Sequence, residues 1–585
     1  MYVLGISAFF HDSSAAVLKD GVIVAAMQEE RLSHVKNDKS FPILSIQSCL
    51  DLLELDIHDI DLVVFHEKPF WKFERIMYTV VRSMPFGFTQ FIQIILNWIP
   101  KRLNTKYEIR KKLGTKKEII FADHHMSHAA SAFYNSGFDQ TAILIMDAVG
   151  EFATTSIGFT KGNKIIFIRQ IHFPHSLGLL YSAFTQYCGF KVNSGEYKLM
   201  GIAAYGNPRY KSMIYDHLIR VFPDGSFELN LQYFSFTEGH QMINKKFCDL
   251  FGQPARLPES DLTSFYSDIA ASIQTVLEEI AIQQVHYCRQ MTGLKNIVFA
   301  GGVFLNCRMN QKIAEQQIFD RHYFYSCPGD AGTSIGAAYL GYFDYLQNER
   351  IHPVHRTSYL GCRLIQSKSP TDLETKLNFW NISYAKISDG FHSIAKLLAE
   401  GKIIGWADGA LEMGARALGH RSILADPRNP AMKDILNKKI KRREEFRPFA
   451  PVILDQYVHS YYKLNNANYD SMMVTANANS NAILNMPSVV HLDGTSRIQV
   501  LSEDQNPSLY SLLRAFHSMT DCPALINTSF NLRGEPMTAK LEDCLHTFLY
   551  SEIDALVLNS SYLILKSSDL TFVKLQIKEN VYPAD

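Results

Sequence analysis

The sequence predicts an α/β protein from two observations: its opening alternates strands with a helix, and its middle repeats a strand that leads through glycine into a helix. Residues 2–8 have an apolar strand pattern, and 15–18 and 22–27 are β-rich runs joined across an Asp-Gly pair, a strong hairpin signal. Helical periodicity over 43–55 and a strand at 62–66 follow. This order is typical of an α/β core and not of a helical bundle or an all-β fold.

Two further junctions extend the pattern. The strand Asn296–Ala300 leads directly into Gly301, Gly302 and Asn306, and the strand Tyr323–Ser326 leads into the loop PGDAGTS and a helix of small residues. A glycine pair between strand and helix lets the backbone approach a nucleotide closely. Together with the opening hairpin, the two junctions resemble the duplicated actin-like ATPase fold, which holds nucleotide in a cleft.

The stretch 121–151 carries the most specific chemical pattern. His124 and His128 are four residues apart in a predicted helix, which places both imidazoles on one face. Asp147 ends a predicted buried strand, and Asp330 stands at the second glycine junction, where helix amides and a cation can share a phosphate. Histidine and carboxylate are the usual ligands of divalent transition metals, so these four residues form a candidate metal site. The alternative for each histidine is a hydrogen-bonded core residue.

Composition and charge exclude several classes. Lys plus Arg equals Asp plus Glu at 58 each in 585 residues, so no overall field directs the chain to nucleic acid or to an anionic membrane. Nine scattered cysteines without a CxxC pair argue against a disulfide framework and a cysteine zinc site. No apolar run reaches the roughly 18 residues of a membrane span, and no signal-peptide pattern opens the chain. We therefore expect a cytoplasmic protein.

Three other stretches of the first half are candidates for binding. The polar loop around His11 lies between apolar strands and could hold phosphate or a reacting group, with a solvated turn as the alternative. Gly, Ser and Asn around Lys198 suit phosphate as well. Residues 68–117 mix aromatic and basic side chains. We interpret them as an amphipathic insertion packed on the core rather than a nucleic-acid or membrane contact.

A linker pattern at 351–358 divides the chain into two predicted domains, 1–350 and 359–585. The second domain contains arginines flanked by apolar or turn residues instead of by mixed charges. Such settings suggest bidentate binding of phosphate or carboxylate, and structural ion pairing is the alternative. The candidates are Arg416, Arg447, Arg497 and Arg533.

The motifs, taken in order, resemble the O-carbamoyltransferases of the nodulation and antibiotic-tailoring type, which include tobramycin, cephem and saxitoxin carbamoyltransferases. The likeness covers nearly the whole chain. It departs from the usual pattern at Ala148, where a glycine is usual, and at Asn37, where a basic residue or histidine is usual. The motifs are HDSSAA, EER with Lys36, DHHMSHAASAF, MDAVGE, HSLGLLYSAFT, SGEYKLMG, AGGVFLN, CPGDAGTSIGAA, RALGHRSILADPR, FRPFAPV and NTSFNLRGEP.

The resemblance implies an N-terminal actin-like domain similar to TsaD and an α+β C-terminal domain similar to YrdC. It also implies that carbamoyl phosphate and ATP form carbamoyl adenylate, whose carbamoyl group passes to a hydroxyl. The four metal ligands would hold iron(II), and His11 and Lys36 would be catalytic, His11 as a neutral base. The residues implied to bind nucleotide, carbamoyl or adenylate groups are Lys198, Gly301, Gly302, Asn306, Arg416, Arg447, Arg497, Asn527, Ser529 and Arg533.

The expected function is therefore ATP-dependent O-carbamoyl transfer to a small hydroxylated natural product, for example a saxitoxin-like alkaloid, or to a sugar. Nucleic acid and membrane are not expected as partners, and the sequence leaves the acceptor and the oligomeric state open. The alternatives are a tRNA threonylcarbamoylation enzyme, an actin-like sugar kinase, a metal-dependent hydrolase and a non-catalytic nucleotide-binding protein.

Overall fold

The computed structural model describes residues 1–82, 104–237, 241–350, 357–365 and 371–566. The chain groups into two compact units. The first contains Met1–Val24, Phe41–Ile43 and Asp56–Arg356, and the second contains Ala25–Ser40, Leu44–Leu55 and Thr357–Asp585. The predicted division at 351–358 stays a prediction, and most of that linker lies outside the described residues. The units differ from the predicted domains because two early segments group with the later residues.

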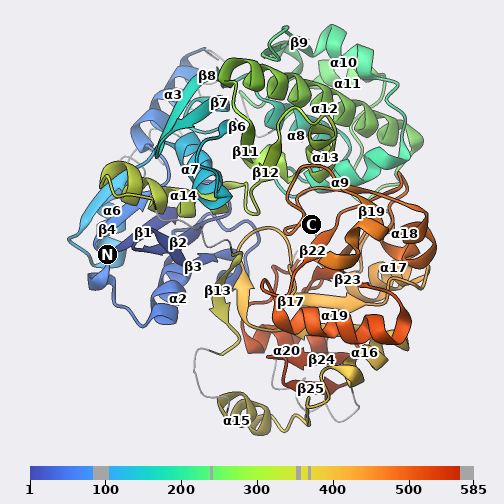
Figure 1. Ribbon diagram of the computed structural model, residues 1–585. Helices are drawn as coiled ribbons and strands as arrows, with labels where there is room; N and C mark the ends of the chain where they lie inside the picture. The colour runs from blue at the N-terminus through green and yellow to red at the C-terminus, as the bar shows by residue number, and fades with distance from the viewer. Residues whose placement is uncertain (83–103, 238–240, 351–356, 366–370, 567–585) are drawn as a thin grey trace. The chain divides into compact units, whose positions relative to one another are not determined.

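The first unit contains most of a five-stranded sheet of order β3-β2-β1-β4-β5, in which β3 continues beyond Val24, the last residue of that segment of the unit (Figure 1). β1 pairs antiparallel with β2, and the β1, β4 and β5 strands are mutually parallel. Every residue of β1 after the first is buried, which explains its unbroken apolar pattern. The bounds are β1 Tyr2–Ser7, β2 Ser14–Lys19, β3 Val22–Gln28, β4 Leu62–Phe65 and β5 Glu118–Phe121.

A second five-stranded sheet in the same unit, of order β12-β11-β6-β7-β8, repeats this topology. β6, β7 and β8 form an antiparallel meander, and β11 and β12 run parallel to β6. Two copies of a meander followed by two parallel strands are the duplicated actin-like arrangement, which confirms the predicted fold class. The bounds are β6 Ala142–Met146, β7 Ala153–Lys161, β8 Lys164–His172, β11 Asn296–Ala300 and β12 Arg321–Phe324.

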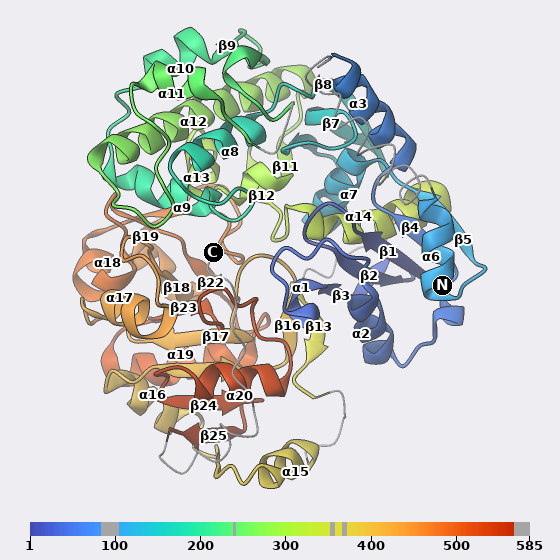
Figure 2. The same cartoon turned by 180° about the vertical axis from the view of Figure 1, so that it is seen from behind.

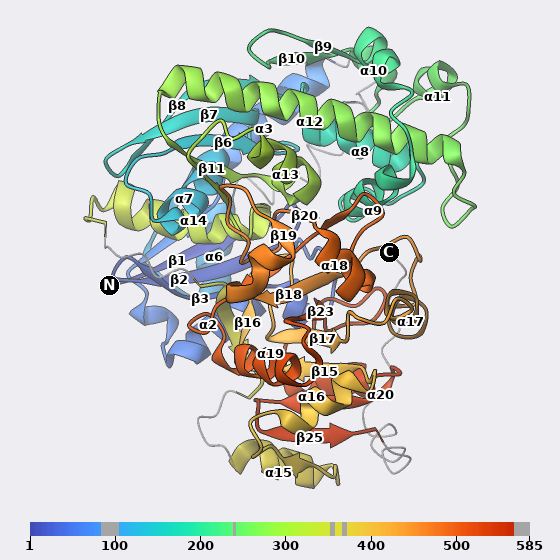
Figure 3. The ribbon, with the colours of Figure 1, turned by 45° about the vertical axis from the view of Figure 1, so that its right-hand side comes forward.

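Helices α7 (His124–Ser136) and α14 (Thr333–Tyr339) pack against each other, α14 also on β1 and α7 also on β11. Their backbones touch at Gly336, where a Cβ would lie 1.7 Å from the Ser127 carbonyl oxygen, so the contact requires glycine. The long helix α12 (Ser264–Thr292) crosses the second sheet and packs beside α13 (Cys307–Glu315) and α8 (Leu177–Tyr187) (Figure 3).

The predicted insertion 68–117 contains α3 (Pro69–Arg82) and α6 (Thr105–Leu113). Residues 83–103 of that insertion lie outside the described residues. Among the described residues, no helix combines the length and the apolar character needed to span a bilayer.

The second unit is built on an eight-stranded mixed sheet of order β14-β25-β24-β15-β17-β23-β18-β22. Helices α16 (His392–Ala399) and α19 (Pro507–Thr520) pack together, and α20 (Leu541–Leu549) contacts β15 (Figure 2). This arrangement confirms the predicted α+β class. The bounds are β14 Ala385–Lys386, β15 Ile404–Ala407, β17 Arg421–Ala425, β18 Ala450–Leu454, β22 Gln499–Leu501, β23 Ala524–Ser529, β24 Ala555–Leu558 and β25 Tyr562–Leu565.

Candidate functional site

The predicted histidine pair stands at the N-terminus of α7, a helix that begins at His124. The side chain of Asp123 caps the helix by accepting the N–H of Met126 at 3.0 Å. Glu151 accepts the N–H of His124 at 3.0 Å, so a second carboxylate also binds this helix end. His128 lies one turn further on, and both imidazoles are buried. The helix therefore presents two histidine side chains to one point.

Asp147 follows β6 and is oriented by the first glycine junction. Its Oδ1 accepts the N–H of Gly302 at 3.1 Å. Gly301 has a φ of 97°, and a Cβ there would lie 2.1 Å from the carbonyl oxygen of Met146. Only glycine fits this approach. The structure thus shows that Gly302 positions a carboxylate, and its facing nucleotide or carbamoyl groups together with Gly301 stays a prediction.

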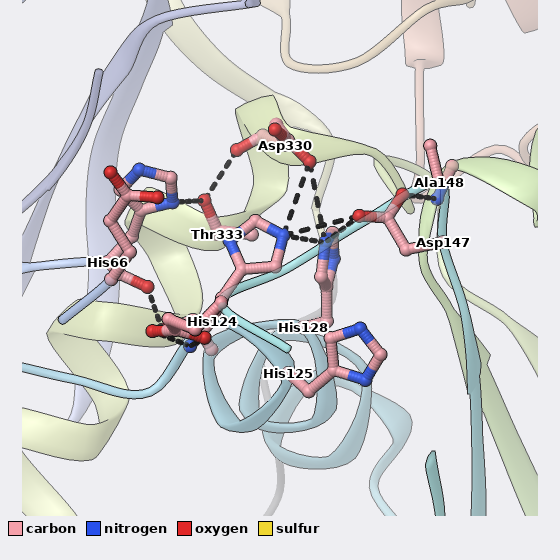
Figure 4. A network of polar contacts seen from close by, with 12 residues as sticks. His66, His124, His125, His128, Asp147, Ala148, Asp330 and Thr333 are labelled. Atoms are coloured by element: carbon pink, nitrogen blue, oxygen red, sulfur yellow. Dashed lines mark hydrogen bonds and ion pairs between the residues drawn. The ribbon is translucent and has the colours of Figure 1, made fainter. Parts of the chain in front are cut away.

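The four predicted ligands meet at one buried point (Figure 4). The Nε2 atom of His124 lies 3.2 Å from Nε2 of His128, 3.3 Å from Asp147 Oδ2 and 3.6 Å from Asp330 Oδ1. The Nε2 atom of His128 lies 3.5 Å from the same Asp330 oxygen. Ligand atoms about 2.1 Å from one cation stand roughly 3 to 3.5 Å from one another, so these separations suit a shared ion.

The state of Asp330 is the clearest indication that the cluster fits a cation. Both of its carboxylate oxygens are buried and accept no hydrogen bond from the described residues. Burial alone would raise its pKa, but His11, His124 and His128 outweigh that effect and lower it well below the usual value. A buried carboxylate without donors is costly unless an ion pairs with it. The mixed histidine and carboxylate set suits a divalent transition metal.

His11 joins this cluster from the loop after β1. Its Nδ1 lies 3.0 Å from Asp12 Oδ2, and its Nε2 lies 3.6 Å from Asp330 Oδ2. Burial disfavours the charged imidazole, yet the carboxylates of Asp330 and Asp12 raise the pKa of His11 to about 10. The carboxylates that face the two ring nitrogens thus favour the imidazolium form. The role of a neutral His11 as a base stays a prediction.

His66 is a functional candidate that sequence reasoning missed, although it ends the predicted strand at 62–66. Its Nδ1 lies 2.8 Å from Thr333 Oγ1, and its ring stands edge-on to that of His124 at 5.3 Å between centroids. His66, Glu67 and His124 form a second group with metal-ligand separations. Lys72 already pairs with Glu67 at 2.8 Å, which makes this group the weaker candidate.

Two predicted nucleotide contacts of the first unit have structural partners. Asn306 caps α13 by accepting the N–H of Met309 at 3.0 Å, and its amide exchanges two hydrogen bonds with Gln274. Lys198 is buried, with its Nζ 5.9 Å from the centre of the Phe190 ring. Neither assignment is tested by these contacts, but Asn306 has its amide engaged within the protein.

In the second unit, Asn527 on β23 makes hydrogen bonds to residues close in sequence to Arg416 and Arg497, two of the predicted arginines. Its Nδ2 donates to Gln499 Oε1 at 2.8 Å and to the carbonyl oxygen of Ala417 at 3.2 Å. Ala417 adjoins Arg416, and Gln499 lies two residues after Arg497. The Oδ1 of Asn527 is buried and accepts no hydrogen bond from the described residues, which leaves an acceptor for a ligand.

Lys441, a buried residue that the sequence analysis missed, lies beside the C-terminal end of β23. The Nζ of Lys441 donates to Asn531 Oδ1 at 2.8 Å and lies 3.3 Å from Ser529 Oγ. Burial, followed by the charges of Arg443 and Arg447, lowers the pKa of Lys441 well below its usual value. Because Lys441 sits in a charge run, KKIKRREEF, no local pattern separates it from solvated lysines. The predicted Ser529 and Arg447 are thus brought into one basic cluster.

The structure places Lys36 in the second unit, in the segment Ala25–Ser40. Its charge contributes to lowering the pKa of Lys441, so it belongs electrostatically to the basic cluster. Arg533 lies in the loop after β23, where Glu535 accepts the N–H of Leu532 at 2.7 Å. Part of the predicted set therefore gathers in two places: His11, His124, His128, Asp147 and Asp330 in the first unit, and Lys36, Arg447 and Ser529 around Lys441 in the second.

Comparison with known proteins identifies the family. Residues 2–339 match the description "Carbamoyltransferase N-terminus", and residues 395–566 match "Carbamoyltransferase C-terminus". This chain belongs to the carbamoyltransferase family. The resemblance found in the sequence and the expectation of an enzyme of this class are therefore confirmed.

Relatives of this carbamoyltransferase extend over most of its length. An uncharacterized protein of Synechocystis sp. is 44% identical over 96% of both chains. Nodulation protein NolNO of Sinorhizobium fredii is 31% identical over 96% of this chain and 80% of that one. Among solved structures, T. kodakarensis HypF is 15% identical with a TM-score of 0.32 and covers 59% of this chain and 48% of that one.

Proposed function

We propose that this carbamoyltransferase forms carbamoyl adenylate from carbamoyl phosphate and ATP and passes the carbamoyl group to a hydroxyl of a small natural product or a sugar. The observation that carries the proposal is the separation of the candidate residues into two chemically different clusters. One gathers carboxylates and imidazoles around a cation-sized point. The other gathers Lys441, Arg443 and Arg447 with Lys36.

The basic cluster suits the adenylating step. Carbamoyl phosphate and water give carbamate and inorganic phosphate, and a carbamate oxygen then attacks the α-phosphorus of ATP and displaces pyrophosphate. Negative charge develops on the leaving pyrophosphate, and fixed cations in a buried setting stabilise it more than water does. Lys441 donates through Nζ and also fixes the Ser529 and Asn531 loop. The unsatisfied Oδ1 of Asn527 can accept a hydrogen bond from the carbamoyl amide or from adenine.

The histidine and carboxylate cluster suits the transfer step, in which the acceptor oxygen bonds to the carbamoyl carbon, AMP leaves and the hydroxyl proton is released. His124, His128, Asp147 and Asp330 would hold a divalent metal, iron(II) in our proposal, which would polarise the carbonyl and offset the charge of Asp330. His11 lies beside these ligands, with its Nε2 3.6 Å from Asp330 Oδ2. In its neutral form it takes the proton of the acceptor hydroxyl as the oxygen attacks, with a contribution of roughly 10² to 10⁴ in rate, and the resulting imidazolium then pairs with the departing phosphate of AMP.

The test is to incubate the purified full chain with Fe²⁺, ATP and carbamoyl phosphate and to measure pyrophosphate and AMP. Pyrophosphate that requires both substrates supports adenylate formation. Release of phosphate alone, independent of ATP, would instead indicate a hydrolase. Mass spectrometry for the gain of one carbamoyl group on hydroxylated metabolites then tests the transfer.

A matched pair of variants separates the basic cluster from general charge effects. Lys441→Met should lower pyrophosphate release by at least tenfold, because it removes the buried amino group that contacts Ser529 and Asn531 beside the end of β23. Lys438→Met removes an exposed lysine three residues away that pairs with Glu445 at 3.0 Å, and it should leave the rate unchanged. Equal rates in the two variants would contradict the assignment of adenylation to this cluster.

A further inference from the structure

Arg75 on α3 is a buried cation whose guanidinium has no direct oxygen contact among the described residues. Its side chain is only 9% exposed. No hydrogen bond or ion pair joins its guanidinium to any residue within the described ranges, and its Nε is fully enclosed. Guanidinium groups at such depth are normally held by carboxylate or carbonyl oxygens, since burying an unpaired charge is costly. An oxygen-bearing group beyond the described residues would complete its contacts.

The surroundings of Arg75 connect it to the transfer cluster. α3 lies beside the β7–β8 hairpin, and the guanidinium lies 5.2 Å from the centre of the Phe173 ring, just after β8 (Figure 2). One turn earlier on α3, the Nζ of Lys72 lies 5.1 Å from the Phe10 ring. Phe10 in turn stands 4.6 Å from the ring of His11. Phe10 thus lies between His11, the proposed proton carrier, and Lys72, and Arg75 follows on the same helix with Phe173 beside it.

Two carboxylates near Arg75, those of Glu67 and Glu151, favour its charged form from a distance but are engaged elsewhere. Glu67 is occupied by Lys72, with 2.8 Å between Nζ and Oε2. Glu151 accepts backbone N–H groups of Lys68 and His124. Both glutamates thus direct their hydrogen bonds to other donors, and within the described residues no carboxylate makes a hydrogen bond or ion pair with the guanidinium. A ligand with an anionic oxygen would supply that contact.

We propose that Arg75, with Phe173 and Phe10, is an acceptor subsite that binds a carboxylate or another anionic oxygen group attached to an apolar ring. The guanidinium would bind the anion in a bidentate manner, and the aromatic rings would contact the ring that carries it. The inference rests on the proposed function in one respect: the molecule bound here is taken to be the acceptor of the carbamoyl group. The site would disfavour a cationic alkaloid, which would meet the charges of Arg75 and Lys72.

Three matched probes test the sign of the preferred charge: 4-(hydroxymethyl)benzoate, the neutral 4-(hydroxymethyl)benzamide and the cationic 4-(hydroxymethyl)benzylamine. Their binding to the full chain is measured by isothermal titration calorimetry, which needs no turnover. We expect the benzoate to bind about tenfold to hundredfold more tightly than the benzylamine, the range of a charge-assisted hydrogen bond. Arg75→Met should reduce this preference to less than about threefold, whereas Arg75→Lys should retain part of it.

Arg220→Met is the control variant, because Arg220 is an exposed arginine 5.0 Å from the centre of the Phe222 ring in the same unit. It should leave the preference for the benzoate unchanged. Circular dichroism and pyrophosphate release show whether each variant is folded, and the wild-type pyrophosphate assay separates failure of the proposed function from failure of this subsite.

Three results would overturn the subsite. The benzylamine could bind as tightly as the benzoate, or the benzoate could fail to bind. Arg75→Met could retain the full preference while Arg220→Met does the same. Finally, Arg75→Met could weaken the binding of AMP and leave the benzoate unaffected, which would assign the guanidinium to the phosphate of the adenylate.

Discussion

Replacing Gly301 by alanine tests how the fold positions the proposed metal ligands. The new Cβ would lie 2.1 Å from the Met146 carbonyl oxygen, whereas real Cβ atoms keep at least 3.0 Å from such neighbours. The junction must therefore open by about 0.9 Å or change its φ of 97°. Either response moves Gly302 away from Asp147 and stretches a 3.1 Å hydrogen bond beyond bonding distance.

The expected size of the effect follows from these contacts. A non-glycine residue in this backbone region costs about 1–3 kcal/mol of unfolding free energy. A hydrogen bond to a carboxylate contributes roughly 1.5–3 kcal/mol, and loss of a group that orients a metal ligand weakens metal binding about tenfold to a hundredfold. Gly301→Ala should therefore lose both stability and metal affinity.

The assays are Co²⁺ titration with a competing chelator and urea unfolding. Gly329→Ala is the matched control, since it adjoins the ligand Asp330, has a φ of −77°, and offers its Cβ a nearest neighbour at 3.9 Å. The control should bind Co²⁺ as the unchanged protein does. If Gly301→Ala bound Co²⁺ equally tightly, the reasoning that this junction orients Asp147 would be refuted.

Three further predictions follow from the two units. Changing both His124 and His128 to alanine should abolish carbamoylated product more severely than pyrophosphate release, and equal loss would contradict the division of steps. Glu412→Ala should destabilise the second unit by about 2–4 kcal/mol in urea unfolding, because its Oε1 accepts three backbone N–H groups of the following loop at 2.7–3.1 Å; Glu412→Gln should cost less. Burial opposes ionisation of Glu535, but His546 and the other hydrogen-bond donors outweigh burial and lower its pKa below 4.5. The ionised Glu535 therefore stabilises the fold above pH 4.5, and this stabilisation is lost as the pH falls through the lowered pKa. Glu535→Gln should flatten the dependence of unfolding free energy on pH in this acid range, and an unchanged slope would contradict the role of Glu535.

Local sequence patterns predicted most elements because each pattern depends on its own neighbours. The Asp-Gly turn between β2 and β3 and the apolar run of β6 are of this kind. The last strand of the second sheet was less accurately placed, with Tyr323–Ser326 predicted and Arg321–Phe324 observed. Its register is decided by pairing of Phe324 with Phe299 on β11, a contact that the local pattern does not contain.

For the metal site, the sequence by itself determined the histidine pair, since a spacing of four residues on a helix places two side chains together wherever the helix lies. It also identified Asp147 and Asp330 by their positions after strands. Only the tertiary structure decided that these carboxylates meet, because β11 and β12 run parallel to β6 and bring their carboxyl ends to one edge. The burial of Lys441 and the approach of Asp330 to His11 likewise depend on segments distant in the chain. Charge and burial are properties of the assembled surroundings, and no window of residues records them.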